Sequence, residues 1–442
     1  YRGPIREKGI PNVFNVFDLD NTKKKARQDE WQEQTQSVFA SVEVGWKSML
    51  YLTLTGRNDW ASQLANSSTP CFFYPSVGLS GVISEMLTLP EFIDYMKVRG
   101  SFSSVGMPYP RNLTSPTYEY DEANQQWKPK THYPIKDLKP ERTNSWELGL
   151  DMRLFKDFSL GFSWYLANTF NQTFDPKVSV SSGYSKIYLQ TGYVRNSGVE
   201  LSLGYGHTWN NHLHWESNFT LSHNKNTIKD LVTSYIHPET GLPITQNRLD
   251  VGGLGKARFI LKKGGTLGDL YTQSDLKRDN SGMVEIDPSG ALTTEDNLPD
   301  IKLGSVFPKA NLAWNNRFEW RGISLSALFT ARIGGIAYSA TQAAMDQYGV
   351  SERSAQARDN GGVLLNGRTL VDAQTYYSLI GNSSGLPQYY TYSATNVRLQ
   401  EASVGYTIPR KRTLRHNCGK SRRAQTYTPT RSSHLSAEFY LS

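Results

Sequence analysis

The chain has 442 residues, of which 38% are hydrophobic and 12% aromatic, and its formal net charge is +8. The aromatic content excludes a disordered chain, because disordered chains are poor in aromatic residues. The charge does not indicate nucleic-acid binding, since residues 410–442 hold eight Lys or Arg and a single acid, which leaves a net charge of +1 for residues 1–409.

Alternation of apolar and polar residues runs along most of the chain and predicts β-strands with two unlike faces. Their length of about ten residues suits a tilted membrane strand. In chain order, the expected strands cover residues 12–18, 38–46, 48–57, 73–83, 96–104, 147–154, 158–166, 194–206, 212–222, 309–318, 322–332 and 396–408. One helix is expected at 88–97, with Thr88 as its N-cap and Pro90 in its first turn.

The connections between these strands alternate in length. Tight turns are expected at 46–48, 155–157, 207–211 and 319–321, with 84–95 as a medium member of the short set. Long polar segments cover 58–72, 105–143, 170–193, 224–308 and 333–395. In an antiparallel meander, consecutive connections lie at opposite ends of the sheet, so one end carries short turns and the other long loops. This arrangement is typical of outer-membrane barrels and not of Greek-key sandwiches.

The two strand faces differ in a way that suits a barrel in lipid. One face carries large apolar residues, and the other carries Gly, Ser, Thr, Glu and Arg, which suit a water-filled interior better than a packed core. The apolar set includes Phe162, Trp164, Trp215, Phe219 and Phe329. The sequence therefore predicts an all-β, antiparallel, up-and-down transmembrane β-barrel. The barrel is expected to be incomplete, with roughly a dozen strands and long loops on one side.

Four stretches in chain order resemble the SusC/RagA family of TonB-dependent outer-membrane transporters. They are 55-TGRNDWAS-62 with 73-FYPSVGLS-80, 137-DLKPERTNSWELGLDMRLF-155, 195-RNSGVELSL-203 and 396-NVRLQEASVGYTIP-409. The second is similar to the family signature that opens a strand. The signature positions are Leu138, Lys139, Pro140, Glu141, Thr143, Glu147, Gly149 and Asp151.

The resemblance implies the barrel part of a transporter that imports oligosaccharides or peptides across the bacterial outer membrane. It also implies two partners, a SusD-like lipoprotein over the loops and the TonB complex. The family's signal, plug domain and TonB box have no counterpart here, so residues 1–409 are expected to be a partial barrel that does not form a stable pore alone. The acidic loop 276-LKRDNSGMVEID-287 departs from the family pattern, so no metal role is transferred to it.

The sequence pattern changes after Pro409, because residues 410–442 are basic and lack alternation. Two explanations stay open for this segment: an out-of-frame or truncated reading, or a disordered basic tail. In either case residues 410–442 are expected to lie outside the barrel.

No catalytic, metal or cofactor site is predicted. His212, His214 and Glu216 alternate along one strand, but neighbours two apart on a strand are about 6.6–6.8 Å apart, too far for easy chelation. The run 252-GGLGK-256 lacks the spacing of a phosphate-binding loop. No nucleophile elbow or H-E-x-x-H motif appears, and no carboxylate pair can be identified from sequence as a glycosidase dyad, so the chain is not expected to be an enzyme.

Aromatic residues are frequent in the long loops, where flat rings suit sugar binding. Tyr120 and Trp127 in one loop, and Tyr389 and Tyr390 in another, are the candidate ligand-binding residues. The alternative is that these rings pack the loops together or lie in the interfacial girdle. For the whole chain, the alternative function is a soluble or surface-attached β-rich carbohydrate-binding module.

Overall fold

The structure is a computed structural model that describes residues 32–108, 113, 119–121, 126–128, 132–133, 139–174, 186–209, 212–236, 243–382, 385–407 and 434–439. Within these ranges, only the backbone is described for residues 119–121, 126–128, 132–133, 174, 186–187, 189–191, 232–236, 243–246 and 434–439.

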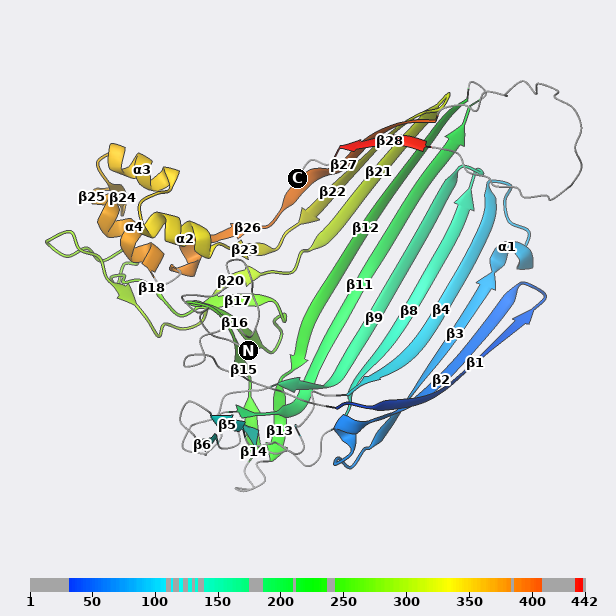
Figure 1. The fold of residues 1–442 in the computed structure, drawn as a ribbon, viewed down its shortest axis with the longest axis horizontal. Coiled ribbons are helices and arrows are strands. Elements are labelled where there is room, and N and C mark those ends of the chain that lie inside the picture. Colours follow the sequence, from blue (N-terminus) through cyan, green and yellow to red (C-terminus); the bar gives the residue numbers. More distant parts are fainter. Residues whose placement is uncertain are drawn as a thin grey trace, which may run out of the picture.

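One twelve-stranded antiparallel sheet dominates the described residues and curves around a hollow (Figure 1). Its strands follow one another in chain order as a meander, which confirms the predicted up-and-down topology. The strands are β1 (Thr35–Trp46), β2 (Leu50–Ala61), β3 (Cys71–Val82), β4 (Ile93–Met107), β8 (Glu141–Leu154), β9 (Phe158–Phe174), β11 (Leu189–Thr208), β12 (Leu213–Asp230), β21 (Ala310–Trp320), β22 (Ile323–Ile333), β27 (Asn396–Thr407) and β28 (His434–Phe439).

From β1 to β27, short and long connections alternate as predicted, whereas 26 residues (408–433) separate β27 from β28. The tight turns at Lys47–Ser48, Phe155–Lys156 and Arg321–Gly322 each place two consecutive residues at positive φ. Such turns twist in the same sense as the strands that they join. The expected strand at 12–18 lies outside the described residues.

The predicted helix at 88–97 is wrong. Between β3 and β4 the structure has one helical turn, α1 (Ile83–Met86), and β4 begins at Ile93. Tyr95 to Met107 pair with β8 in continuous register, so backbone pairing across the sheet outweighs the local helix signal.

The register places apolar residues next to one another across eleven strands. Because directly paired residues point to the same face, this row forms a continuous apolar band on one side of the sheet. The row is Trp46, Leu50, Gly81, Val98, Leu150, Phe162, Leu201, Leu221, Leu312, Ala331 and Val397.

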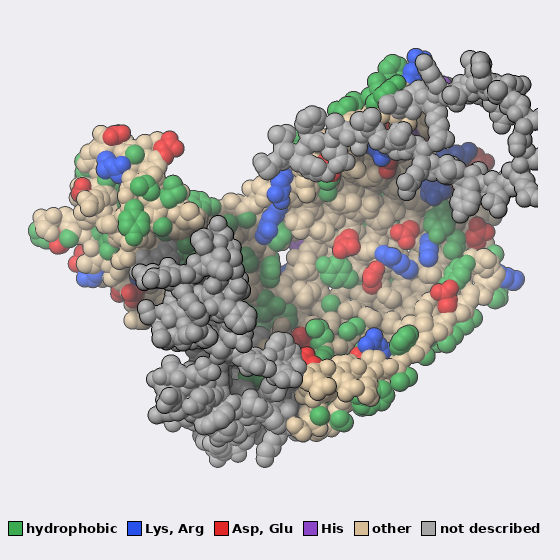
Figure 2. Space-filling model, viewed as in Figure 1, with side chains coloured by type: hydrophobic (Ala, Val, Ile, Leu, Met, Phe, Trp, Pro, Cys, Tyr) green, Lys and Arg blue, Asp and Glu red, His purple; other side chains and the backbone are tan. Residues whose placement is uncertain are grey.

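The adjacent row, which faces the opposite side, is polar. It contains Gly45, Tyr51, Ser80, Arg99, Gly149, Ser163, Glu200, Ser222, Asn311, Arg332 and Asn396. Figure 2 shows acidic and basic side chains in the hollow of the sheet and hydrophobic side chains along its outer margin. The two faces therefore differ as the alternation predicted.

The apolar face is not covered by a second sheet in the described part of the chain. Phe162 is 40% exposed and Leu325 is 48% exposed, as lipid-facing side chains of an isolated barrel wall are. The described strands also leave the barrel open, since β1 and β28 are the two ends of the sheet order. No helix among the described residues is long and apolar enough to span a membrane.

The long loops contain their own secondary structure. A four-stranded sheet is formed by β15 (Arg248–Leu254), β16 (Ala257–Lys262), β17 (Asp269–Thr272) and β20 (Ile301–Ser305). Three helices follow in the last loop: α2 (Ala340–Gln347), α3 (Glu352–Asp359) and α4 (Ala373–Gly381).

Shorter elements complete the loops. The paired strands are β5 (Glu119–Asp121) with β6 (Gln126–Lys128), β7 (His132–Tyr133) with β10 (Lys186–Ile187), β13 (Val232–Ile236) with β14 (Pro243–Gln246), β18 (Asp275–Leu276) with β19 (Thr294–Glu295), β23 (Ile336–Tyr338) with β26 (Thr391–Ser393), and β24 (Val363–Leu365) with β25 (Thr369–Val371). The 3-10 turns are η2 (Ser62–Leu64) and η5 (Pro387–Tyr389).

Within residues 410–442, the structure describes only the backbone of β28, which pairs with β27 from Ala402 to Thr407. The lack of alternation in this segment therefore does not prevent one strand from pairing with the sheet. The boundary at residue 409 stays a prediction, since residues 408–433 lie outside the description.

Candidate functional site

The polar face of the sheet carries a network of charged side chains at its centre. Arg99 on β4 forms an ion pair with Glu147 on β8 (3.2 Å) and donates to Ser163 Oγ on β9 (2.7 Å). A groove of about 650 Å³ runs over this face, with Arg99, Asp151, Glu200 and Arg332 among its lining residues. Charged groups of both signs on a water-exposed wall can contact polar cargo or a polar protein segment inside a barrel.

Two residues of the predicted family signature explain this network. Glu147 is the ion-pair partner of Arg99, and Gly149 leaves the space over which the Arg99 side chain lies. A Cβ on residue 149 would overlap the Nε and Cγ atoms of Arg99. The signature thus encodes a close fit between a long side chain and a bare backbone on the next strand.

We expect Gly149→Ala to destabilise the folded barrel by about 0.5–1.5 kcal/mol, because the new methyl group must displace the half-exposed Arg99 side chain from its hydrogen bond and its ion pair. The measurement is the denaturant midpoint of the folded receptor in lipid vesicles. Gly206→Ala is the matched control, since nothing lies within 4 Å of its added Cβ. Equal midpoints for the two variants would refute the role given to Gly149.

A second signature stretch links the sheet to a long loop. Asn226 on β12, 9% exposed, donates to Asn196 Oδ1 on β11 (2.9 Å) and accepts from the backbone N–H of Leu267 (2.8 Å). Beside these residues, Val194, Ile228, Leu231, Leu249 and Leu261 form a buried cluster between the strand ends and the loop sheet. The loop sheet is therefore fixed to the barrel wall by packing and by hydrogen bonds.

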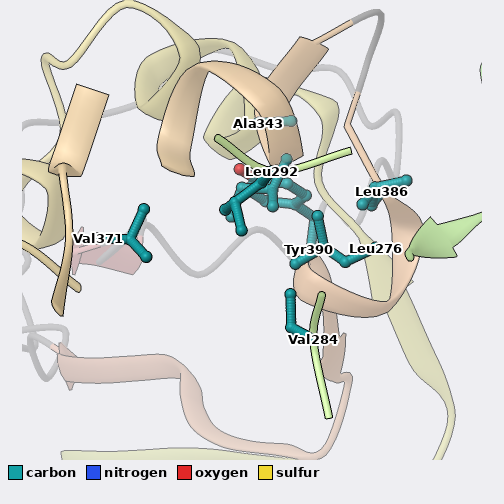
Figure 3. Packing of buried hydrophobic residues seen from close by; sticks show 8 residues of the cluster. Leu276, Val284, Leu292, Ala343, Val371, Leu386 and Tyr390 are labelled. Carbon is teal, nitrogen blue, oxygen red and sulfur yellow. The ribbon is translucent and has the colours of Figure 1, made fainter. Parts of the chain in front are cut away.

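The described residues of the loops 231–309 and 334–395 fold together into one unit, which we call the loop subdomain. Its core joins Leu276, Val284 and Leu292 of the first loop to residues of the second, as Figure 3 shows. The members from the second loop are Ala343, Val371, Ile380, Leu386 and Tyr390. Segments about a hundred residues apart thus form a single apolar core beyond the long-loop end of the sheet.

Polar contacts fix the two loops to each other. Asn366 bonds both backbone groups of Val284: it accepts from the N–H (3.0 Å) and donates to the carbonyl (2.9 Å). Gln388 donates to the carbonyl of Ser274 (3.1 Å) and to Asp275 Oδ1. Because backbone groups are bonded from the other loop, neither loop can move far without breaking these contacts.

A buried ion pair lies inside the loop subdomain. The Asp346 side chain is fully buried and accepts hydrogen bonds from Arg353 Nε (2.7 Å), Ser351 Oγ (2.5 Å) and Gln342 Nε2 (3.0 Å). Burial alone would raise the pKa of Asp346, but the hydrogen bonds and charge of Arg353 outweigh burial and lower this pKa. The Arg353 guanidinium also lies over the Tyr390 ring, 5.0 Å from its centroid.

Asp300 joins two strands of the loop sheet, where it accepts from Arg248 Nε (2.7 Å) and pairs with Lys262 Nζ (2.9 Å). The hydrogen bond from Arg248 lowers the pKa of Asp300 from 3.8 to about 2. A lowered pKa in the folded state stabilises the loop sheet above about pH 4, and this contribution is lost as the pH falls from about 4 through about 2.

We therefore expect amide protection of β15 and β16, corrected for intrinsic exchange rates, to decrease over that pH interval. Asp300→Asn should remove most of this pH dependence. Glu285→Gln, which breaks an ion pair exposed on both sides, is the control and should leave it unchanged. The same pH profile in Asp300→Asn as in the unmodified chain would contradict the role of Asp300.

The four predicted ligand-binding residues fall in different environments. Tyr390 is fully buried in the core of the loop subdomain, as the packing alternative for these rings describes, and offers no surface to a ligand. Tyr389 is partly exposed, packs against the same core and donates to Asp275 Oδ1 (3.3 Å). The side chains of Tyr120 and Trp127 lie outside the described residues, although their backbones form β5 and β6.

The remaining signature residues lie at the start of β8 and along it. Pro140 accepts at its carbonyl from Asn171 Nδ2 (3.3 Å), and Thr143 bonds Thr169 on β9 (2.9 Å). Lys139 lies two residues before the start of β8, Glu141 opens the strand opposite Met107, and Asp151 lies opposite Lys97. Leu138 lies outside the description.

The residues considered above for a metal site and for a phosphate-binding loop have structural roles. His214 bonds Thr208 across the β11–β12 hairpin (2.8 Å), and Glu216 accepts from Asn218 (2.8 Å). His212 precedes β12 at positive φ, and Gly252 to Gly255 close the β15–β16 hairpin. Within the described part of the chain, no three His, Cys, Asp or Glu side chains converge as a metal site would require.

The helices of the loop subdomain and its ion pair were missed by the sequence analysis. Each helix has an N-cap that the sequence shows: Ser339, Ser351 and Asp372 each accept a backbone N–H three residues on. These caps could have predicted the three helix starts. The pairing of Asp346 with Arg353 follows from the turn between α2 and α3, for which the sequence has no equally clear signal.

Comparison with known proteins places this geometry in a family. The family described as TonB dependent receptor-like, beta-barrel, matches residues 4–399. TonB-dependent receptor P3 of Formosa agariphila is 22% identical over 431 residues, which cover 90% of this chain and 41% of that receptor. TonB-dependent receptor P39 of the same organism is 24% identical over 296 residues, or 64% of this chain and 25% of its own length.

Solved structures agree with the sequence relatives. The RagAB peptide transporter has a TM-score of 0.68 at 17% identity, with 90% of this chain and 44% of that chain covered. The RagAB peptide importer in its 'closed-closed' state has a TM-score of 0.67 at 18% identity, with the same coverage. These TM-scores show a shared fold, and the chain spans about two fifths of the length of the proteins that match most of it.

Proposed function

Because the chain belongs to the TonB-dependent receptor β-barrel family, we propose that it supplies barrel wall and extracellular ligand-facing loops to an outer-membrane importer. The observation that carries this proposal is the pair of adjacent rows across the sheet, one apolar and one polar, with the long loops between β2 and β27 at one end. A barrel in lipid needs both features: an apolar outer band and a polar lumen. The family is one of receptors and transporters.

The cargo that we propose is an oligosaccharide or a peptide too large for simple diffusion pores. Two features support it: the charged groove on the lumen wall and the aromatic side chains of the loops. Tyr376 contacts both Tyr377 and Tyr389 edge to face, and Tyr389 donates a hydrogen bond to the carboxylate of Asp275. Ring faces next to carboxylate and amide groups suit both sugars and peptide side chains.

Two partners are part of the proposal. A SusD-like lipoprotein would cover the loops, and the TonB complex of the inner membrane would supply the energy. The loop subdomain supports a docking role, because it is rigidly packed and exposes Tyr348, Val350, Leu364 and Leu370, each at least 56% exposed. Exposed apolar side chains on a rigid unit are typical of a protein interface. The alternative, a soluble carbohydrate-binding module, is not supported, since no described residues cover the apolar face of the sheet.

The test is uptake of fluorescent oligosaccharides and peptides by cells that depend on the receptor carrying these strands. Uptake of one cargo class should require TonB and should fall in Tyr389→Ala and Trp127→Ala. Tyr406→Ala is the control for cargo contact, because Tyr406 is a 50% exposed tyrosine on the outward face of β27, opposite Ile323 and next to a short turn. Uptake of both cargo classes without TonB would contradict the importer role, and normal uptake in both variants would contradict the proposed ligand contacts.

A further inference from the structure

The outward apolar face is not uniform, because a row of small side chains interrupts it on four strands. The row is Ser217 on β12, Asn316 on β21, Ala327 on β22 and Ala402 on β27. The neighbouring same-face row toward the long loops is Phe219, Trp314, Phe329 and Leu399. The row toward the short turns is Trp215, Phe318, Leu325 and Val404. The small row is thus the floor of a trough between two ridges of large side chains.

The ridges rise from the face and are fixed in position. Trp215 stacks on Phe318 with ring centroids 5.6 Å apart, and Trp314 lies 5.9 Å from Phe329. Phe318, Leu325 and Val404 are 41%, 48% and 54% exposed, so the rim stands clear of other described parts of the chain. The open part of the trough, over β21, β22 and β27, has a volume of about 330 Å³.

The polar atoms of the floor are already bonded by the ridges. Trp314 Nε1 donates to Ser217 Oγ (3.0 Å), and Trp215 Nε1 donates to Asn316 Oδ1 (3.3 Å). These bonds let a serine and an asparagine lie on an apolar face at low cost, since polar groups in hydrocarbon must be paired. The rest of the floor, Ala327 and Ala402, presents only methyl groups.

We propose that this trough binds one phospholipid acyl chain from the membrane leaflet next to the short turns. The inference rests on the proposed function, which places this face in lipid. The floor row lies about 6.6–6.8 Å from each ridge row along the strands. The space between the two ridges is therefore wide enough for one hydrocarbon chain. The outward face is convex (Figure 1), so a second barrel would rest on the ridges and would not reach the alanine floor.

The trough should hold its chain in one place, whereas the rest of the outer face exchanges lipid freely. An acyl chain gains no hydrophobic energy here, because lipid tails are as apolar as the protein face. What favours the trough is dispersion, since a chain that touches the floor and a ridge makes more close contacts than a chain on a flat face does. The tight fit depends on the small floor. A leucine at Ala327 or Ala402 would fill the space that the chain needs.

The experiment uses the receptor carrying these strands, in nanodiscs doped with a phosphatidylethanolamine whose acyl chain bears a diazirine. After illumination, labelled residues are mapped by mass spectrometry. We expect labelling to concentrate near Leu325 and Val404 and to fall to the level of the flat outer face in the double variant Ala327→Leu/Ala402→Leu, because the added side chains fill the floor of the trough. Ala331→Leu, which has the same chemistry on the same face of β22 outside the trough, should label like the unmodified receptor.

Two results would overturn the inference while leaving the importer role intact. One is labelling spread over the outer face in proportion to exposure, with Leu148, 57% exposed, labelled as strongly as Leu325. The other is an unlabelled trough together with a dimer that the double variant abolishes, which would assign the trough to a second copy. Labelling of the polar face in place of the apolar face would instead contradict the proposed function itself.

Discussion

Replacing Arg353 by Ala is expected to destabilise the loop subdomain by about 3–5 kcal/mol, because a fully buried carboxylate would lose its charged partner. Asp346 keeps hydrogen bonds from Ser351 and Gln342, but neither carries a compensating positive charge. The ring of Tyr390 would also lose the cation that lies over it. The helices α2, α3 and α4 should then open together, since their packing meets at this pair.

The measurement is amide hydrogen exchange of residues 340–381, which reports the free energy of opening of the three helices. Arg358→Ala is the matched control on the same helix: Arg358 is exposed and bonds only the carbonyl of Gly349 among the contacts described for it. Arg353→Leu combined with Asp346→Leu should recover much of the loss, since an apolar pair leaves no buried charge. Equal protection in Arg353→Ala and Arg358→Ala would rule out the ion pair as a main support of these helices.

Leu203→Arg on β11 is expected to cost about 2–4 kcal/mol, the penalty of an arginine on the lipid face near the bilayer centre. Leu203 lies on the apolar face opposite Leu160 and Phe219 and is 40% exposed. Its neighbour Ser202 lies on the polar face, opposite Gly161 and Thr220. Ser202→Arg places the same charge one residue away in the lumen, where water and Asp151 can receive it.

Denaturant unfolding of the receptor in lipid vesicles compares the two variants. Leu203→Arg and Ser202→Arg place the same charge on the same strand at nearly the same depth. Their difference therefore reports only whether the arginine points to the apolar or to the polar face of the sheet. A loss of stability of the same size in both variants would show that the two faces have the same environment.

The sheet could be predicted from sequence because its strands need only local alternation. Each expected strand from 38–46 to 396–408 overlaps a strand of the structure, and the faces carrying Phe162 and Phe329 are as predicted. The signature residues Glu147 and Gly149 could be located on a strand, but their shared contact with Arg99 could not. That contact depends on the register between β4 and β8, which alternation alone does not determine.

The loops could not be predicted because their contacts join distant residues. Leu276 packs with Tyr390, and Val284 is bonded by Asn366, so no window of sequence contains the partners. Tyr390 illustrates the consequence: an aromatic residue in a polar loop suggests an exposed binding ring, yet the fold of two loops buries it completely. The segment 88–97 shows the opposite problem, since a good helix signal gives way to strand pairing with β8.

The central claim is that one face of this sheet contacts lipid and the other contacts water. Spin labels placed at each residue from Ser324 to Ala331 on β22, in the receptor reconstituted into lipid vesicles, test it most directly. Collision with membrane-dissolved oxygen should peak at Leu325, Ala327, Phe329 and Ala331, and collision with a water-soluble nickel complex should peak at the residues between them. Low accessibility of Leu325 and Phe329 to both reagents would mean that this face is buried against protein and would contradict the claim.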